Sequence, residues 1–130
     1  RNSSPSTQLG QALVIASIGG NDFLRRLPSG DTEAALRRIV AASREASALV
    51  LLVAVPQPSL AGAAGLGLAD HPLYARLAEG LQLPLHAGGW SRVLGDDKLK
   101  SDAIHANAAG YRAFAEGLAA TLRTQQLLAH

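Results

Sequence analysis

Two short, continuous apolar runs set the strongest limit on how this chain can fold. They are ALVIASI, at residues 12–18, and LVLLVAV, at residues 49–55, and both contain β-branched residues. Each run stops at residues that interrupt strands, Gly19–Gly20 in the first case and Pro56 in the second. Strands without polar alternation are buried on both faces, which is typical of a parallel sheet covered by helices.

Helical patterns alternate with these runs. Residues 30–47 carry apolar side chains at helical spacing, and Asp31 or Thr32 is the expected N-cap. The other expected elements are a helix at 71–81, a short strand at 83–88, a helical turn at 90–95 and a C-terminal amphipathic helix capped by Asn107. This alternation predicts an α/β fold with a parallel sheet and right-handed crossovers. Residues 1–11, rich in Ser, Pro and Gln, are expected to be a tail or linker.

Two polar clusters are expected at one edge of that sheet. In parallel α/β sheets the ligand lies beyond the carboxyl ends of the strands. The first apolar run leads directly into Gly19–Gly20–Asn21–Asp22, and the loop after the third strand carries Asp102 and His105. The predicted convergence of clusters so distant in sequence is the main indication of function.

Asp102–Ala103–Ile104–His105 combines an acid with an imidazole. Histidine can take and return a proton near neutral pH, and a carboxylate on one ring nitrogen fixes its tautomer. A turn over three residues can bring the Asp102 carboxylate to the His105 ring. The alternative is a solvated acid and a surface histidine beside a helix cap, because the pattern is short and common. A metal site is disfavoured, since no further ligand stands at matching spacing.

The Gly19–Gly20–Asn21–Asp22 cluster is the more specific of the two. Glycines at a strand end allow a sharp turn or a close approach to a ligand. The side-chain amide of Asn21 can donate a hydrogen bond to an oxyanion, while Asp22 can bond to backbone amides of the loop. An ordinary strand-to-loop turn is the alternative, because turns favour the same residue types.

Composition excludes several classes of protein. The absence of cysteine rules out disulfides, thiolate metal sites and a cysteine nucleophile. Net charge is +2 and aromatic residues make up 4%, which argues against a nucleic-acid partner. No apolar run is long enough to span a bilayer. No nucleotide-binding motif is present, so no cofactor is expected.

In this order, the two clusters resemble the SGNH (GDSL-type) hydrolase family, with the closest likeness to bacterial arylesterases and acyl-thioesterase/lysophospholipase-like esterases. The resemblance runs from about residue 12 to the end. Gly19–Gly20–Asn21–Asp22 corresponds to the family's Gly-x-Asn-Asp block, and Asp102–His105 corresponds to its Asp-x-x-His block. The resemblance implies a flavodoxin-like parallel sheet and hydrolysis of a small acyl ester or thioester through an acyl-serine. It also implies that His105 is the general base, Asp102 orients it and Asn21 lies in the oxyanion hole.

The Gly-Asp-Ser-Leu block that carries the family's nucleophile is absent, as is the second block. The serines of NSSPST (2–7) follow no predicted strand, so the nucleophile is not assigned. We expect residues 12–130 to be the C-terminal part of one SGNH domain, incomplete at its N-terminus. The first strand would then expose a hydrophobic edge, which we expect an N-terminal fragment or a second copy to cover. A catalytically inactive association module is the alternative, and the compartment (periplasmic, secreted or cytoplasmic) stays open.

Overall fold

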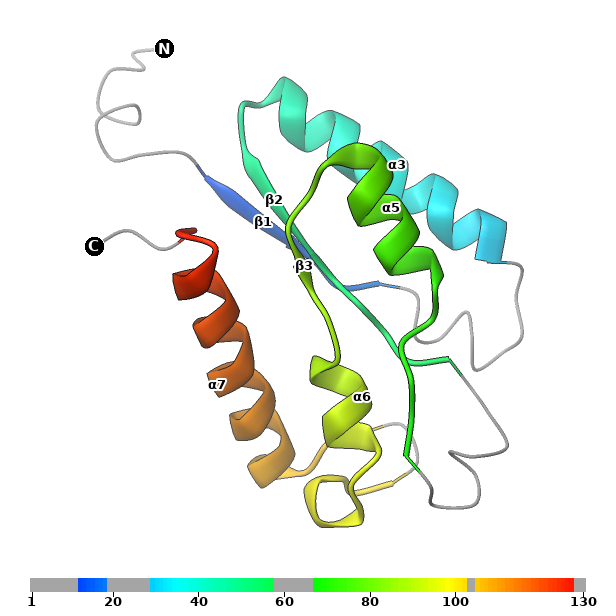
Figure 1. Ribbon diagram of the computed structural model, residues 1–130, viewed down its shortest axis with the longest axis vertical. Coiled ribbons are helices and arrows are strands. Elements are labelled where there is room, and N and C mark those ends of the chain that lie inside the picture. Colours follow the sequence, from blue (N-terminus) through cyan, green and yellow to red (C-terminus); the bar gives the residue numbers. More distant parts are fainter. Residues whose placement is uncertain (1–11, 19–28, 58–66, 103–104, 128–130) are drawn as a thin grey trace.

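The computed structural model describes residues 12–18, 29–57, 67–102 and 105–127, and the expected tail at 1–11 lies outside them. Three strands form a parallel sheet in the order β1-β2-β3 (Figure 1). They are β1 (Leu13–Ala16), β2 (Leu49–Val53) and β3 (Leu85–His86). The predicted α/β fold with a parallel sheet is therefore confirmed.

The helices also follow the predicted order. They are α3 (Ser29–Glu45), α5 (Leu73–Leu81), α6 (Gly89–Leu94) and α7 (Ala108–Thr124), with a short 3₁₀ helix, η1 (Asp97–Leu99), before α7. Asn107 caps α7 as expected, since its side chain accepts a hydrogen bond from the Gly110 amide. The expected caps of α3 were wrong: α3 begins at Ser29, so Asp31 lies in its first turn and Thr32 is buried inside it.

One face of the sheet is closed by α3 and α5, and α7 lies on the other side (Figure 1). The strand register pairs Ala16 with Leu52, and both side chains belong to the closed core. Leu36 of α3 and the α5 residues Leu73 and Leu77 pack there with at most 1% of their surface exposed. Burial of this size is what a continuous apolar strand requires on its closed face.

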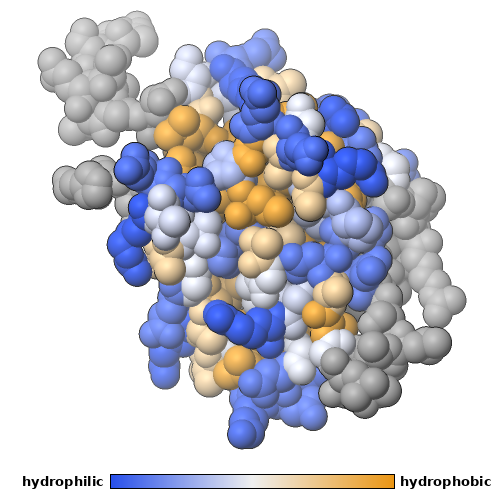
Figure 2. Space-filling view, in the orientation of Figure 1, coloured by the Kyte–Doolittle hydropathy of each residue, from blue (hydrophilic) through white to orange (hydrophobic). Residues whose placement is uncertain are grey.

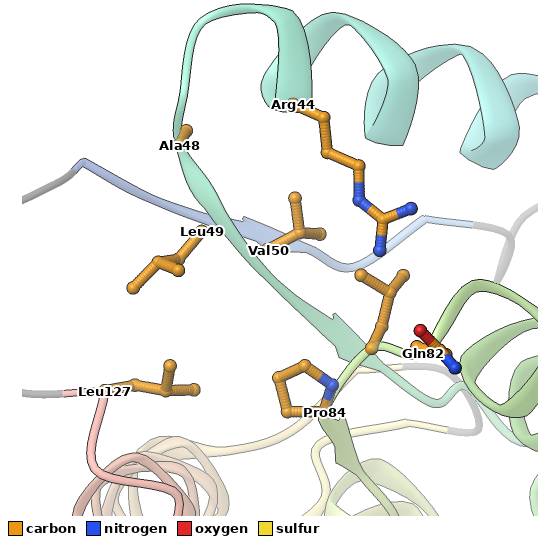
Figure 3. Close-up of a pocket in the computed structure, with 8 residues that line it drawn as sticks. Arg44, Ala48, Leu49, Val50, Gln82, Pro84 and Leu127 are labelled. Atoms are coloured by element: carbon orange, nitrogen blue, oxygen red, sulfur yellow. The ribbon is translucent and has the colours of Figure 1, made fainter.

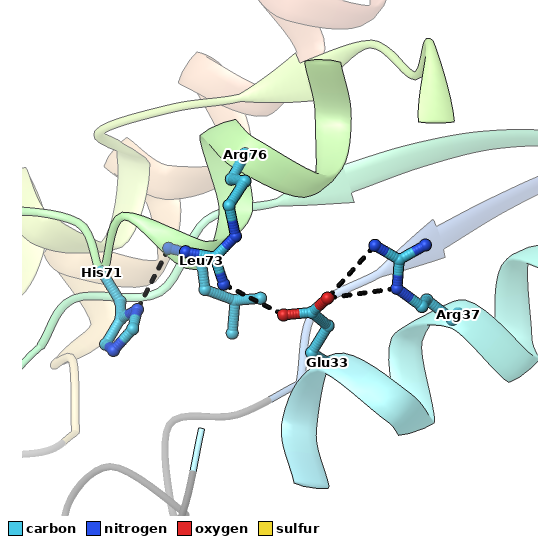
Figure 4. Close-up of polar contacts among 5 residues, drawn as sticks. All are labelled: Glu33, Arg37, His71, Leu73 and Arg76. Carbon is cyan, nitrogen blue, oxygen red and sulfur yellow. Dashed lines mark hydrogen bonds and ion pairs between the residues drawn. The ribbon is translucent and has the colours of Figure 1, made fainter. Parts of the chain in front are cut away.

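Polar contacts tie α3 to α5 (Figure 4). Glu33 of α3 accepts hydrogen bonds from Arg76 of α5 at 2.9 Å and from Arg37 at 3.1 Å. The Arg76 and Arg37 guanidinium groups hold the pKa of Glu33 below its usual value. His71 lies at the start of α5, where its Nδ1 accepts a hydrogen bond from the Leu73 amide at 3.1 Å.

The opposite face of the sheet is open over β1. Ile15 is 43% exposed, Leu49 is 38% exposed and Tyr111 of α7 is 52% exposed; we call these three residues the open face. Because Ile15 pairs with Leu51 in a parallel register, it points to the same side as Leu49. Among the described residues, β1 pairs only with β2, so its other edge is unpaired.

A small hollow lies at the amino ends of β2 and β3, with a volume of about 150 Å³ (Figure 3). In Figure 3, Leu49 points toward Leu127, while Val50 points toward Arg44 of α3. The hollow is at the end of the sheet opposite the carboxyl edge, so it is separate from the predicted site. Figure 2 shows hydrophobic residues, in orange, gathered over the strands between α3 and α7. Within the described ranges, no helix is long and apolar enough to cross a membrane.

Candidate active site

Asp102 and His105 form a carboxylate–imidazole pair. Both oxygens of the Asp102 side chain lie 3.0 Å from Nδ1 of His105. The backbone N–H of His105 also donates to Oδ1 of Asp102 at 2.8 Å. With Nδ1–H directed at the carboxylate, Nε2 is the ring nitrogen able to accept a proton. Each side chain is 58% exposed, so the pair is accessible to a reactant.

The loop that carries this pair is closed by backbone hydrogen bonds. Ser101 N–H donates to the His105 carbonyl at 2.9 Å, and Asn107 N–H donates to the Leu99 carbonyl at 2.9 Å. Lys100 and Ala106 form the antiparallel bridge between these two bonds. The chain therefore turns back on itself, which places Asp102 and His105 side by side at the tip.

Aromatic contacts join the end of β1 to α6 and α7. The Trp90 indole N–H donates to Oγ of Ser17, just after β1, at 3.4 Å. The Trp90 ring stacks on Phe114 of α7 at 3.8 Å between centroids and meets Tyr111 edge-on at 6.1 Å. Through these contacts, Trp90 links the carboxyl end of β1 to α7.

Gly19, Gly20, Asn21 and Asp22 lie outside the described residues, so the structure does not place the predicted oxyanion donor. The described chain before them ends at Ile18. The roles of Asn21, Asp102 and His105 in catalysis therefore stay predictions, although the geometry of the Asp102–His105 pair is in place. In the described part of the chain, no group of three or more potential ligands could hold a metal ion.

Two anchors near the carboxyl edge were missed by sequence reasoning. The Tyr74 hydroxyl donates to the Ile18 carbonyl at 2.6 Å. Asp70 accepts hydrogen bonds from the Gly88 amide at 2.7 Å and from the Ser91 hydroxyl at 2.5 Å, which fixes the start of α6. Both contacts join segments far apart in the chain, and no short motif signals them.

The surroundings of His86 were also not evident from the sequence. It is 6% exposed at the end of β3, and its Nδ1 lies 2.7 Å from Oγ1 of Thr121 in α7. Its Nε2 is buried without a hydrogen-bond partner among the described residues. Burial, and next the positive charge of Arg92, lower the pKa of His86, while Asp70 opposes that shift.

Comparison with known proteins adds to this geometry. Residues 2–113 match the GDSL-like lipase/acylhydrolase family. No curated protein matches the chain. The crystal structure of TesA is 26% identical with a TM-score of 0.70, and the match covers 92% of this chain and 68% of TesA. The psychrotrophic esterase EstA from Pseudoalteromonas sp., in a structure inhibited by monoethylphosphonate, is 18% identical with a TM-score of 0.74; the match covers 98% of this chain and 70% of EstA.

Proposed function

Because the chain belongs to the GDSL-like lipase/acylhydrolase family, we propose that it forms part of a serine ester hydrolase that cleaves a small acyl ester or thioester. The observation that carries this proposal is the contact between Asp102 and Nδ1 of His105 at 3.0 Å. An imidazole held in this way is suited to general base catalysis, because the opposite nitrogen can accept a proton.

In the proposed reaction, Nε2 of His105 takes the proton of a serine hydroxyl as its oxygen attacks the acyl carbon. The same proton then passes to the departing alkoxide or thiolate, which leaves an acyl-serine. His105 next activates water, which releases the acid and restores the serine. Asp102 stabilises the imidazolium in both halves of the reaction. Asn21 donates to the developing oxyanion, and Gly19, Gly20 and Asp22 shape its loop.

We place the nucleophilic serine in polypeptide outside these 130 residues. None of the described serines donates to the His105 ring, and Ser101, the nearest in sequence, donates to the His105 carbonyl instead. The matched parts of TesA and EstA make up 68% and 70% of those chains, so each has further chain with no counterpart here. The serines at 2–7, to which the sequence assigned no role, lie outside the described residues.

The same additional polypeptide is our proposed cover for the edge of β1 and the open face. A strand beside β1 would pair the edge that has no partner strand among the described residues, and an apolar helix over Ile15 and Tyr111 would bury side chains that are 43% and 52% exposed. A second copy of the chain is the other possible cover. The extra polypeptide is favoured because it accounts for both the missing nucleophile and the open face.

Intact-mass spectrometry after treatment with an ethoxy fluorophosphonate probe tests the proposal. The 130-residue chain alone is expected to stay unlabelled, whereas the protein from its natural source is expected to carry one adduct on additional polypeptide. The adduct should be lost in His105→Ala. Labelling of a serine within the 130 residues would overturn the placement of the nucleophile. A natural protein that contains the additional polypeptide yet is neither labelled nor active on p-nitrophenyl acetate would favour the inactive association module.

A further inference from the structure

We infer that Asn107 is a positioning residue for the Asp102–His105 pair, in addition to being the cap of α7. This inference rests on the proposed function for the importance of the pair, but its structural content stands on the geometry of the loop. Asp102 and His105 are each 58% exposed, so packing does little to fix their side chains. Their relative position depends on the hydrogen bonds within the loop, including that from the His105 amide to Oδ1 of Asp102, and on the backbone that holds both ends of the loop.

The Asn107 side chain bonds in two directions. Its Oδ1 accepts a hydrogen bond from the Gly110 amide at 2.9 Å, within the first turn of α7. Its Nδ2 donates to the Lys98 carbonyl in η1 at 2.9 Å. The backbone N–H of the same residue donates to the Leu99 carbonyl at 2.9 Å. One residue thus joins the 3₁₀ helix before the loop to the helix after it.

Close packing between η1 and the first turn of α7 reinforces the connection that Asn107 makes. Gly110 is buried, and a Cβ atom built on it would lie 2.0 Å from the Leu99 carbonyl oxygen and 2.9 Å from Cβ of Ala106. Ala106 is itself 6% exposed. The first turn of α7 therefore sits directly on η1, at a distance that leaves no room for a side chain at position 110.

Asn107, which joins η1 to α7, lies two residues after His105 in the sequence. Between Leu99 and Asn107 the chain leaves η1, makes the bridge at Lys100 and Ala106, and returns to α7. If the bond from Nδ2 to the Lys98 carbonyl is lost, this hairpin can move relative to α7. The Asp102 carboxylate can then shift relative to Nδ1 of His105, because the two residues lie on opposite arms of the hairpin that the Lys100–Ala106 bridge closes.

A residue that only caps α7 would give different results from a residue that positions the Asp102–His105 pair. The variant Asn107→Asp distinguishes these two roles. Aspartate keeps the oxygen that caps Gly110 and suits the positive end of a helix dipole. It lacks the amide donor to the Lys98 carbonyl. Asn107→Ser is the uncharged companion, because serine also caps helices and cannot replace the amide donor. If Asn107 only caps α7, both variants should behave like the wild type.

The test is the tautomer of His105, read from the ¹⁵N chemical shifts of its ring at the alkaline plateau of an NMR titration and assigned with His105→Gln. The wild type is expected to have mainly Nδ1–H. Both Asn107 variants are expected to gain a substantial Nε2–H population. Amide exchange at His105 should quicken about tenfold, since its N–H bonds to Asp102. Asp102→Asn serves as the reference for a broken pair, and unchanged His86 signals confirm that the fold persists.

A wild-type tautomer and wild-type amide exchange in both variants would overturn the inference. The readout needs no nucleophile, so it is independent of the fluorophosphonate experiment: an unlabelled natural protein would defeat the proposed hydrolase and leave the tautomer result intact. In the complete hydrolase, the inference further predicts that Asn107→Asp lowers kcat with little change in KM, because the substrate does not touch this side chain.

Discussion

The hydroxyl of Tyr74 donates to the carbonyl of Ile18 at 2.6 Å, although the two residues are far apart in the sequence. Tyr74 belongs to α5 and is fully buried. Ile18 is the described residue just before the Gly19–Gly20–Asn21–Asp22 cluster. Helix α5 therefore holds the backbone at the point where β1 leads into the proposed oxyanion loop.

Tyr74→Phe is expected to lower the free energy of unfolding by about 1–2 kcal/mol, because it removes one hydrogen bond to a partly buried carbonyl. Urea denaturation measures the change. Tyr111→Phe is the matched control: Tyr111 is 52% exposed, and a surface change of this kind should stay within about 0.5 kcal/mol. Equal stability losses in the two variants would show that the Ile18 contact does not contribute.

The order and type of the main elements could be predicted from local patterns. The apolar runs at 12–18 and 49–55 contain β1 and β2, because a strand buried on both faces needs uninterrupted apolar side chains. The Asn107 cap followed from its place before an amphipathic pattern. The start of α3 did not follow: Thr32 is buried at 1%, so a residue type that favours caps serves here inside the helix.

The surroundings of the candidate site were only partly accessible to sequence reasoning. Asp102 and His105 are three residues apart, so their contact depends on a single turn. The Asp70 contacts with Gly88 and Ser91 depend instead on how a loop after β2 returns to the start of α6. Such long-range contacts arise from tertiary packing, and local propensity carries no information about them.

Stability is expected to fall as the pH drops below about 6.5, the ordinary histidine pKa. Burial lowers the pKa of both His71 and His86, so the unfolded chain binds these protons more readily than the folded protein. Their contribution is fully present above pH 6.5 and is lost as the unfolded-state histidines become protonated. Each can contribute a slope of at most about 1.4 kcal/mol per pH unit. Urea unfolding between pH 8 and 5.5 measures the sum.

His86→Gln and His71→Asn separate the two histidines. Each variant should show a shallower fall in stability than the wild type over that pH range, whatever its stability at pH 8. Asparagine at 71 can still accept a hydrogen bond from the Leu73 amide, so it preserves the start of α5. The lowered pKa of Glu33 acts at more acidic pH, since its stabilisation is lost as the carboxyl is protonated. An identical pH slope in both variants and the wild type would contradict this account.

In the proposed complete hydrolase, His105→Ala should abolish turnover, because the proposed general base is lost. Asn21→Ala should lower kcat by about a hundred- to a thousandfold, because Asn21 is the proposed oxyanion donor and the loss of one such donor has an effect of this size. Steady-state hydrolysis of p-nitrophenyl acetate measures both. Glu79→Gln, an exposed position of α5 outside the proposed machinery, provides the control for losses during purification. Unchanged turnover in His105→Ala and Asn21→Ala would rule out the assigned roles.

Gly110→Ala and Gly80→Ala are expected to change stability in opposite directions. Both glycines lie inside helices, where alanine alone should add about 0.5–1 kcal/mol. At Gly80, in α5, a Cβ atom meets nothing within 4 Å, so that gain should be observed. At Gly110 the Cβ atom would lie 2.0 Å from the Leu99 carbonyl oxygen, which is backbone and cannot rotate away. Overpacking of this kind costs about 1–3 kcal/mol.

Urea denaturation gives the free energy of unfolding of the two alanine variants. Both variants gain the same intrinsic helix preference, so the difference between their free energies reports the contact of α7 with η1. Gly110→Ala should also separate η1 from the first turn of α7, which weakens the Asn107 bond to the Lys98 carbonyl. The His105 tautomer should then shift as it does in Asn107→Asp. If Gly110→Ala were more stable than the wild type and kept the wild-type His105 tautomer, η1 would be able to move away from α7 without disturbing Asp102 and His105. The close contact at Gly110 would then have no part in holding the Asp102–His105 pair.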